Sequence, residues 1–203
     1  MFDAALRNII DPPLNAVGVR IAAIGISANT VTGFGFLLGI SAVPLIVTEQ
    51  YGAALVLILL NRLFDGLDGA VARHSLLTNF GGYLDIVCDF IFYAAIVFGF
   101  ALARPENALY AAFLIFSFMG TGSSFLTYAI MAEKHGISTD IRGRKSLYYL
   151  GGLAEGGETI VAMLLMCIFP DYFMIIALVF GAMCWVTTVT RIYAAWLTFG
   201  KSN

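Results

Sequence analysis

The strongest constraint on this chain is a series of long apolar segments that few charged residues interrupt. A helix needs about 20 mostly apolar residues to cross a bilayer. We predict six membrane-spanning helices, over residues 29–48, 51–72, 82–103, 107–131, 147–169 and 172–198. Short polar breaks separate them, such as Glu49-Gln50 and Pro170-Asp171. The pattern therefore predicts an all-α integral membrane protein with six transmembrane helices.

The composition agrees with this fold class and excludes a soluble globular protein. Hydrophobic residues make up 60% of the chain and charged residues only 12%, whereas a soluble domain has about 25% charged residues. No basic run is long enough to neutralise a row of phosphates, so nucleic acid is not an expected partner. The expected surroundings of the apolar helices are membrane lipids.

Residues 1–28 precede the first predicted span and mix apolar residues with arginines. We expect a short amphipathic helix that lies at the membrane interface, and Pro12 and Pro13 are expected to break any longer helix. The predicted organisation is therefore an interfacial segment, 1–28, followed by a six-helix transmembrane catalytic domain, 29–203.

Lysine and arginine residues predict the orientation in the membrane. An even number of spans places both termini on one side, and that side carries eight of these residues against Arg104 alone on the other. The eight are Arg7, Arg20, Arg73, Lys134, Arg142, Arg144, Lys145 and Lys201. Because cytoplasmic loops are enriched in positive charge, both termini should be cytoplasmic.

Four aspartates occur where the second predicted span ends and the third begins. Asp65 and Asp68 are three residues apart, and Asp85 and Asp89 are four apart, so each pair shares one helix face. A charge at membrane depth costs about 2.5 kcal/mol or more. Divalent cations with a preference for oxygen, such as Mg²⁺, Mn²⁺ or Ca²⁺, would offset that cost. Four carboxylates can serve two metals, an arrangement suited to phosphoryl displacement.

Small residues and an arginine accompany the aspartates. Gly66 and Gly69 reduce helix propensity but let a ligand approach the backbone, and Ala72 lies one turn beyond Gly69. Arg73 offers a planar donor fork that suits phosphate. A site of metal, small residues and arginine fits a diphosphate.

These residues resemble the signature of the CDP-alcohol phosphotransferases, D-x-x-D-G-x-x-A-R-x8-G-x3-D-x3-D. The matching positions are Asp65, Asp68, Gly69, Ala72, Arg73, Gly81, Asp85 and Asp89. One departure is that seven residues, not eight, separate Arg73 from Gly81. We interpret this as a loop shortened by one residue. Six spans with the motif between the second and third also resemble the family.

The resemblance implies a metal-dependent reaction in phospholipid biosynthesis. A CDP-linked lipid such as CDP-diacylglycerol would give its phosphatidyl group to an acceptor alcohol and release CMP. Asp65, Asp68 and Asp85 would be the main ligands of Mg²⁺ or Mn²⁺, with two ions per site. Asp89 would be the general base and would also touch the second metal.

The resemblance further implies a donor site and an assembly. Asp65, Gly69, Ala72, Arg73 and Gly81 would line the pocket for the CDP donor. The active site would face the cytoplasm, and the protein would form a homodimer. Which alcohol accepts the group, and which CDP-linked lipid donates it, stay open.

Other polar residues are weaker candidates. Residues that could bind the acceptor are Arg142, Lys145, Glu155, Glu158 and Arg191. For Glu155 and Glu158, holding a helix junction is an equally good reading, and Arg142 and Lys145 also serve as topology signals. Asn29 and Thr32 are expected to cap the first span.

Three rival functions account for the aspartates less well. An intramembrane cation-binding transporter would explain carboxylates in the membrane but not Gly69, Ala72 and Arg73 at these spacings. An intramembrane aspartyl protease needs only a dyad. A catalytically inactive relative is disfavoured because all four aspartates are present.

Overall fold

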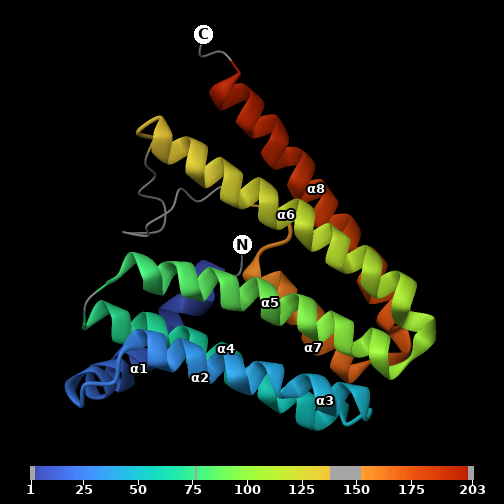
Figure 1. Cartoon of the computed structure of the whole chain (residues 1–203), viewed down its shortest axis with the longest axis horizontal. Coiled ribbons are helices and arrows are strands. Elements are labelled where there is room, and N and C mark those ends of the chain that lie inside the picture. Colours follow the sequence, from blue (N-terminus) through green and yellow to red (C-terminus); the bar gives the residue numbers. More distant parts are fainter. Residues whose placement is uncertain (1–2, 76, 138–151, 201–203) are drawn as a thin grey trace. The chain divides into compact units, whose positions relative to one another are not determined.

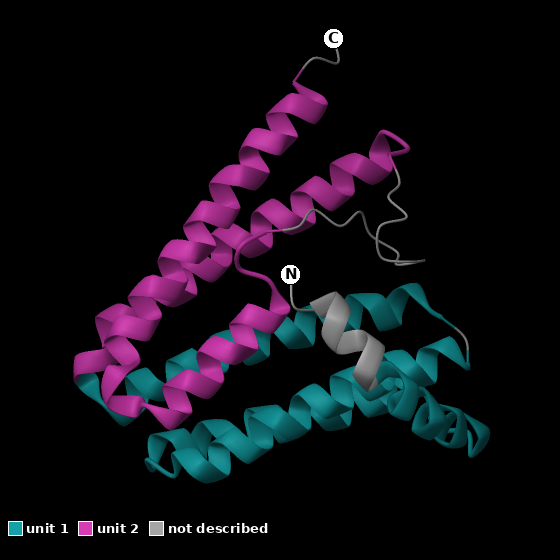
Figure 2. Ribbon diagram, turned by 180° about the vertical axis from the view of Figure 1, so that it is seen from behind, with its two compact units in different colours: residues 1–105 teal, residues 106–203 magenta. Residues whose placement is uncertain are grey.

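The computed structural model describes residues 3–75, 77–137 and 152–200, and the side chains of residues 3–10 lie outside that description. Every regular element in these ranges is a helix, which confirms the all-α class (Figure 1). The chain forms two compact units, Met1–Pro105 and Glu106–Asn203, drawn in teal and magenta in Figure 2.

The part of the first unit that the structure describes forms five α-helices. They are α1 (Asp3–Ala23), α2 (Ala28–Ile40), α3 (Ala42–Val47), α4 (Tyr51–Arg73) and α5 (Asn79–Ala103). A break at Ser41 separates α2 from α3, and the Ser41 hydroxyl donates to the carbonyl of Leu37 at 2.8 Å. Such back-bonding to the preceding turn bends helices. Together the bent pair α2–α3 covers the single predicted span 29–48.

Helix α2 and its continuation α3 hold the unit together. Each of them packs against both α4 and α5, whereas within the described residues α4 and α5 make few direct backbone contacts with each other. Helices α4 and α5, which carry the aspartates, are thus held near each other because both pack on α2–α3. This spacing leaves room between α4 and α5 for long side chains to meet.

The expectation that Pro12 and Pro13 break the N-terminal helix is wrong. Helix α1 runs through both prolines to Ala23. Proline removes a backbone hydrogen bond but its fixed φ is helical, so packing can offset the loss. Leu14 is buried in a core cluster with residues of α2 and α4, and Gly18 lies directly against Ala70. Helix α1 therefore docks on α4, while its amphipathic character and interfacial position stay predictions.

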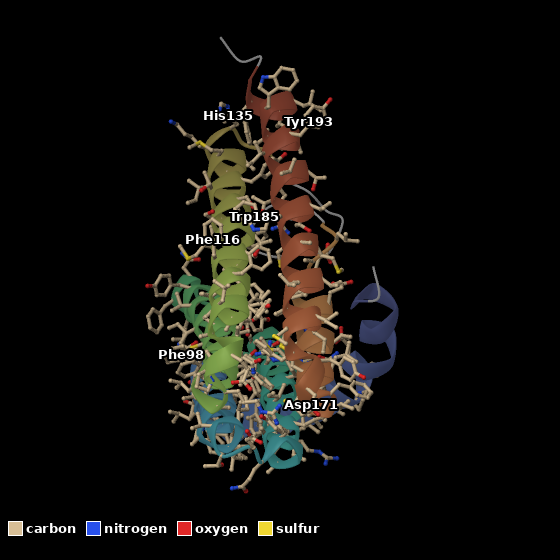
Figure 3. All side chains as sticks on the ribbon, turned by 90° about the vertical axis from the view of Figure 1, so that its right-hand side faces the viewer. Phe98, Phe116, His135, Asp171, Trp185 and Tyr193 are labelled. Atoms are coloured by element: carbon tan, nitrogen blue, oxygen red, sulfur yellow. The ribbon has the colours of Figure 1, made fainter. Side chains whose placement is uncertain are left out.

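The described residues of the second unit, with Pro105 before them, form three α-helices and two short 3-10 turns. They are η1 (Pro105–Asn107), α6 (Ala108–Lys134), α7 (Gly156–Ile168), η2 (Pro170–Tyr172) and α8 (Phe173–Phe199). Helix α8 packs against α6 and α7. Phe116 of α6 and Trp185 of α8 illustrate the α6–α8 seam, with ring centroids 5.0 Å apart (Figure 3).

The helix predicted over 147–169 is shorter than expected in the described residues. It begins at Gly156, because Glu155 and Glu158 form a capping box that satisfies the first free backbone N–H groups. A helix of 13 residues is about 20 Å long, less than the ~30 Å of a bilayer core. Residues 138–151 lie outside the described part of the chain.

Four of the six predicted spans are confirmed by length and composition among the described residues. They are Ala28–Val47, Asn79–Ala103, Pro105–Lys134 and Pro170–Phe199. Helix α4 is long enough, but its second half carries Arg62, Asp65, Asp68 and Arg73. It and the short α7 stay predicted spans. These apolar helices make the chain an integral membrane protein.

The α1–α4 contact gives a test of the docked N-terminal helix. A Cβ at Gly18 would lie 2.8 Å from the Cβ of Ala70 and 2.9 Å from its backbone carbon. We predict that Gly18→Ala destabilises the protein by about 1–3 kcal/mol through overpacking. A lower midpoint of thermal unfolding in detergent, with faster proteolysis near the N-terminus, would show it.

Gly33→Ala is the matched control, because a Cβ there meets nothing within 4 Å. It should leave stability unchanged or slightly higher, since alanine favours helix over glycine. Equal stability of the two variants would contradict the docking of α1 on α4.

Candidate active site

A pocket in the first unit is lined by residues of three helices, most of them polar. Helix α2 contributes Thr32, Gly35 and Phe36, α4 contributes Asn61, Arg62, Asp65 and Asp68, and α5 contributes Asp85, Cys88 and Asp89. All four predicted aspartates therefore reach one cavity. The helical spacings of three and four residues bring each pair onto the face that lines it.

Asp68 is held by a hydroxyl on α2. Its side chain is buried, and the Oγ1 of Thr32 donates to Asp68 Oδ2 at 2.6 Å. The expectation that Thr32 caps the first span is wrong, because Ser27 is the N-cap and its hydroxyl accepts from the backbone N–H of Thr30 at 3.2 Å. Thr32 lies in the next turn, where its hydroxyl faces α4 instead.

Three of the carboxylates form a group that suits a cation. Asp65, Asp68 and Asp85 each offer one oxygen, and these oxygens lie within 4.8 Å of one another. One Mg²⁺ or Mn²⁺ would bring its ligand oxygens to about 3–4 Å of one another. Small side-chain movements are enough to close the group around one ion. The residues present therefore fit a hard divalent cation.

Asp89 lies in the same pocket but has different partners. Arg62 Nη2 donates to Asp89 Oδ1 at 2.7 Å, and the Tyr93 hydroxyl donates to Asp89 Oδ2 at 3.0 Å. Arg62 Nη1 also lies 3.6 Å from Asp65 Oδ2. One arginine thus faces a carboxylate of the metal group and the carboxylate predicted to be the base.

The remaining signature residues lie at the adjoining ends of α4 and α5. Arg73 is exposed, and its Nε and Nη2 donate to Asn15 Oδ1 of α1 at 3.1 and 2.8 Å. A Cβ on Gly69 would lie 3.6 Å from Arg73 Nη1, an ordinary van der Waals contact, so Gly69 lies beside the guanidinium. Ala72 is half-buried in the same turn.

Gly81 lies close to a side chain of α2. A Cβ there would lie 2.9 Å from Asn29 Oδ1 and 3.1 Å from Thr78 Oγ1. Thr78 caps α5 by accepting from the backbone N–H of Gly81 at 3.0 Å. The glycine lets the start of α5 lie against α2.

All the predicted acceptor residues belong, by sequence, to the second unit. Arg142 and Lys145 lie outside the described residues. Glu155 and Glu158 cap α7, where the backbone N–H of Glu155 donates to Glu158 Oε2 at 3.2 Å. Arg191 of α8 is buried, donates from Nη1 to the carbonyl of Thr121 at 3.0 Å and stacks on a ring of α6. Their described contacts are with the second unit, and acceptor binding by them stays a prediction.

Sequence reasoning missed Arg62, Tyr93 and Thr32 as site residues. Helical spacing could have identified two of them, since Arg62 precedes Asp65 by three residues and Tyr93 follows Asp89 by four. No local spacing points to Thr32, because its partner Asp68 is 36 residues away.

Comparison with known proteins identifies the class. The sequence model of the CDP-alcohol phosphatidyltransferases matches residues 25–197, so the chain belongs to this family. It is a membrane-embedded phosphatidyltransferase, and the transporter, protease and inactive-relative alternatives are set aside.

Individual relatives extend the similarity to nearly the whole chain. The chain is 50% identical to the Escherichia coli inner membrane protein YnjF over 98% of its own length and 97% of that protein. It is 28% identical to the archaetidylinositol phosphate synthase of Pyrococcus horikoshii, covering 94% of each chain.

A solved structure shares the fold. The phosphatidylinositol phosphate synthase PgsA1 of Mycobacterium tuberculosis, with CDP-DAG bound, superposes with a TM-score of 0.72 at 20% identity, covering 90% of this chain and 93% of that one.

The Thr32 contact gives a test of the carboxylate group. Partners that orient a metal ligand are typically worth about 10- to 100-fold in metal affinity. We predict that Thr32→Val, which keeps the side-chain shape, weakens Mn²⁺ binding to the purified protein by that factor. Electron paramagnetic resonance of free Mn²⁺ would measure it.

Thr30→Val is the control, since Thr30 contacts Ser27 near the start of α2, outside the pocket. It should bind Mn²⁺ like the original protein. Unchanged binding by Thr32→Val would show that Asp68 needs no fixed orientation.

Proposed function

We propose that this protein transfers a phosphatidyl group from CDP-diacylglycerol, or a closely related CDP-linked lipid, to an acceptor alcohol in a metal-dependent reaction that releases CMP. The observation that carries the proposal is the group of Asp65, Asp68 and Asp85 oxygens within 4.8 Å of one another. This group lies inside the signature of a family that performs this class of transfer.

Asp65, Asp68 and Asp85 would hold Mg²⁺ or Mn²⁺, and the four carboxylates together offer ligands for two ions. The metal would neutralise charge on the donor diphosphate. A structure of PgsA1 in complex with manganese and citrate supports metal binding in this fold.

Asp89 would take the proton from the acceptor hydroxyl. The acceptor oxygen then attacks the phosphorus that carries the diacylglycerol, and the bond from that phosphorus to the oxygen of CMP breaks. Asp65, Gly69, Ala72 and Gly81 would line the donor site and Arg73 would bind the diphosphate. Catalysis by positioning and charge neutralisation is typical of phosphoryl transfer.

The names of two relatives guide the choice of acceptor. An archaetidylinositol phosphate synthase and a phosphatidylinositol phosphate synthase are among the similar proteins. Inositol phosphate is therefore the first acceptor to try, followed by glycerol phosphate, inositol, serine, ethanolamine and choline. We also propose a cytoplasmic active site, from the distribution of lysine and arginine, and a homodimer, from the family resemblance.

Release of CMP by the purified protein tests the proposal directly. CDP-diacylglycerol, Mg²⁺ or Mn²⁺ and each acceptor in turn should give CMP with one alcohol and none after chelation of the metal. CMP release that depends on neither the metal nor the acceptor would contradict the proposed function.

The role of Asp89 predicts a separation of binding from turnover. We expect Asp89→Asn to lower kcat by about 10²- to 10⁴-fold, the range for loss of a general base, with donor binding largely retained. Asp65→Asn is the comparison, because it should lose donor and metal binding as well. Equal loss of donor binding in both variants would count against Asp89 as the base.

The role of Arg73 predicts a change on the donor side. Removal of a charged hydrogen-bond donor costs about 1.5–3 kcal/mol, so Arg73→Ala should raise the donor KM by roughly 10- to 100-fold while the acceptor KM stays within about twofold. Arg20→Ala, which changes an arginine at the end of α1, is the control. A raised acceptor KM with an unchanged donor KM would refute the assignment.

A further inference from the structure

Arg62 lies outside the family signature, yet the pocket is built around it. It enters the cavity from α4, one turn before Asp65, and bridges to Asp89 on α5. Since α4 and α5 each pack mainly against α2–α3, this side-chain bridge is a direct link between the two helices that carry the aspartates.

The guanidinium is fixed rather than free to move. Its Nε and Nη2 donate to Asn61 Oδ1 at 2.8 and 2.6 Å, and the Asn61 amide donates in turn to the carbonyl of Gly35 at 2.9 Å. Its Nη1 donates to the Tyr93 hydroxyl at 3.2 Å. The group also stacks on two rings of α5, at 5.0 Å from Phe92 and 5.5 Å from Tyr93.

These contacts exclude one role for Arg62 and favour another. Each guanidinium nitrogen already has an acceptor within the unit, so the residue is not arranged to receive a substrate phosphate. Its position instead determines where the Asp89 carboxylate lies. Arg62 binds Oδ1 and the Tyr93 hydroxyl binds Oδ2, so both oxygens are fixed and each keeps a lone pair for a further partner.

The same contacts separate Asp89 from the other carboxylates. The group of oxygens that can share an ion consists of Asp65, Asp68 and Asp85, while Asp89 is paired with a cation of the protein itself. The four aspartates therefore have two roles: three of them are grouped for a metal ion, and Asp89 is oriented by Arg62.

We propose that Arg62 and Tyr93 are positioning residues that hold Asp89 in the orientation needed for proton transfer and keep it out of the primary metal group. The inference rests on the proposed function, because it assigns a partner to the proposed base. It adds two residues that the signature does not contain, and it predicts that their loss damages turnover without damaging metal binding.

The experiment compares Arg62→Gln, Arg62→Lys and Tyr93→Phe with the original protein. Three quantities are measured on each: Mn²⁺ affinity without substrates, the donor KM, and kcat for metal-dependent CMP release. Tyr93→Phe keeps the ring beneath the guanidinium, and Arg62→Lys keeps the charge, so at least these two variants preserve most of the packing.

Arg104→Gln is the matched control. Arg104 Nε binds Glu49 Oε1 at 3.0 Å, and its guanidinium stacks on Tyr51 at 5.9 Å. It therefore combines an ion pair with a ring contact, as Arg62 does, in the same unit but away from the pocket. Its loss should leave all three quantities unchanged.

A positioning role predicts that kcat falls while the donor KM and Mn²⁺ affinity are retained. In Arg62→Gln, kcat should fall by about 10²-fold, as expected when a reacting group is misplaced, and the donor KM should stay within about threefold. Mn²⁺ should bind equally or more tightly, because a cation 3.6 Å from Asp65 has been removed. Tyr93→Phe should lower kcat by roughly tenfold, and Arg62→Lys should recover part of the loss.

Other outcomes overturn the inference. Weaker Mn²⁺ binding together with a raised donor KM and low kcat in all three variants would assign Arg62 to general packing of the pocket. A kcat equal to that of the original protein in Arg62→Gln would remove the positioning role while leaving the proposed function intact. If the original protein releases no CMP with any acceptor, the proposed function fails and the positioning role fails with it.

Discussion

Repulsion among four carboxylates in an apolar helical unit is the constraint on which the site depends. Asp68 is buried, and Asp65, Asp85 and Asp89 line the same pocket. Charges that leave water need compensation from close partners. Within the unit, Thr32 donates to Asp68 and Arg62 pairs with Asp89 and faces Asp65. These contacts leave the three-oxygen group as the place where an external cation is needed most.

The packing of α2–α3 makes this arrangement possible. Because these helices contact both α4 and α5, the two aspartate-bearing helices are held apart at the pocket and meet through long side chains. Small residues allow the close approaches that this requires. Gly39 of α2 lies against the Asn61 amide and the Phe92 ring, where a Cβ would be only 2.8 Å from either. The helix that supplies Thr32 therefore also sets the width of the cavity.

The N-terminal helix α1 contacts Arg73, the arginine that we propose to bind the CDP-linked donor. Helix α1 packs on α4 through Leu14 and Gly18, and one residue beyond Leu14 the Asn15 amide oxygen accepts from Arg73. The arginine that we propose to bind the diphosphate is thus oriented by a segment that the sequence alone describes only as interfacial. The docking of Leu14 and Gly18 on α4 brings Asn15 to this position.

The sequence by itself determined the all-α membrane class, the four aspartates and the family, because apolar run length and helical spacing are local properties that survive without tertiary context. It offered a helix-junction role for Glu155 and Glu158 beside acceptor binding, but it placed the start of their helix at 147, whereas the described helix begins at Gly156. Only the tertiary structure decided which polar groups meet the aspartates. Thr32 and Asp68 are 36 residues apart and Arg73 and Asn15 are 58 apart, and no periodicity links residues at such distances. The uninterrupted α1 depends likewise on packing between helices, which outweighs the local preference of proline, whereas the bend at Ser41 coincides with a local hydrogen bond of the serine hydroxyl.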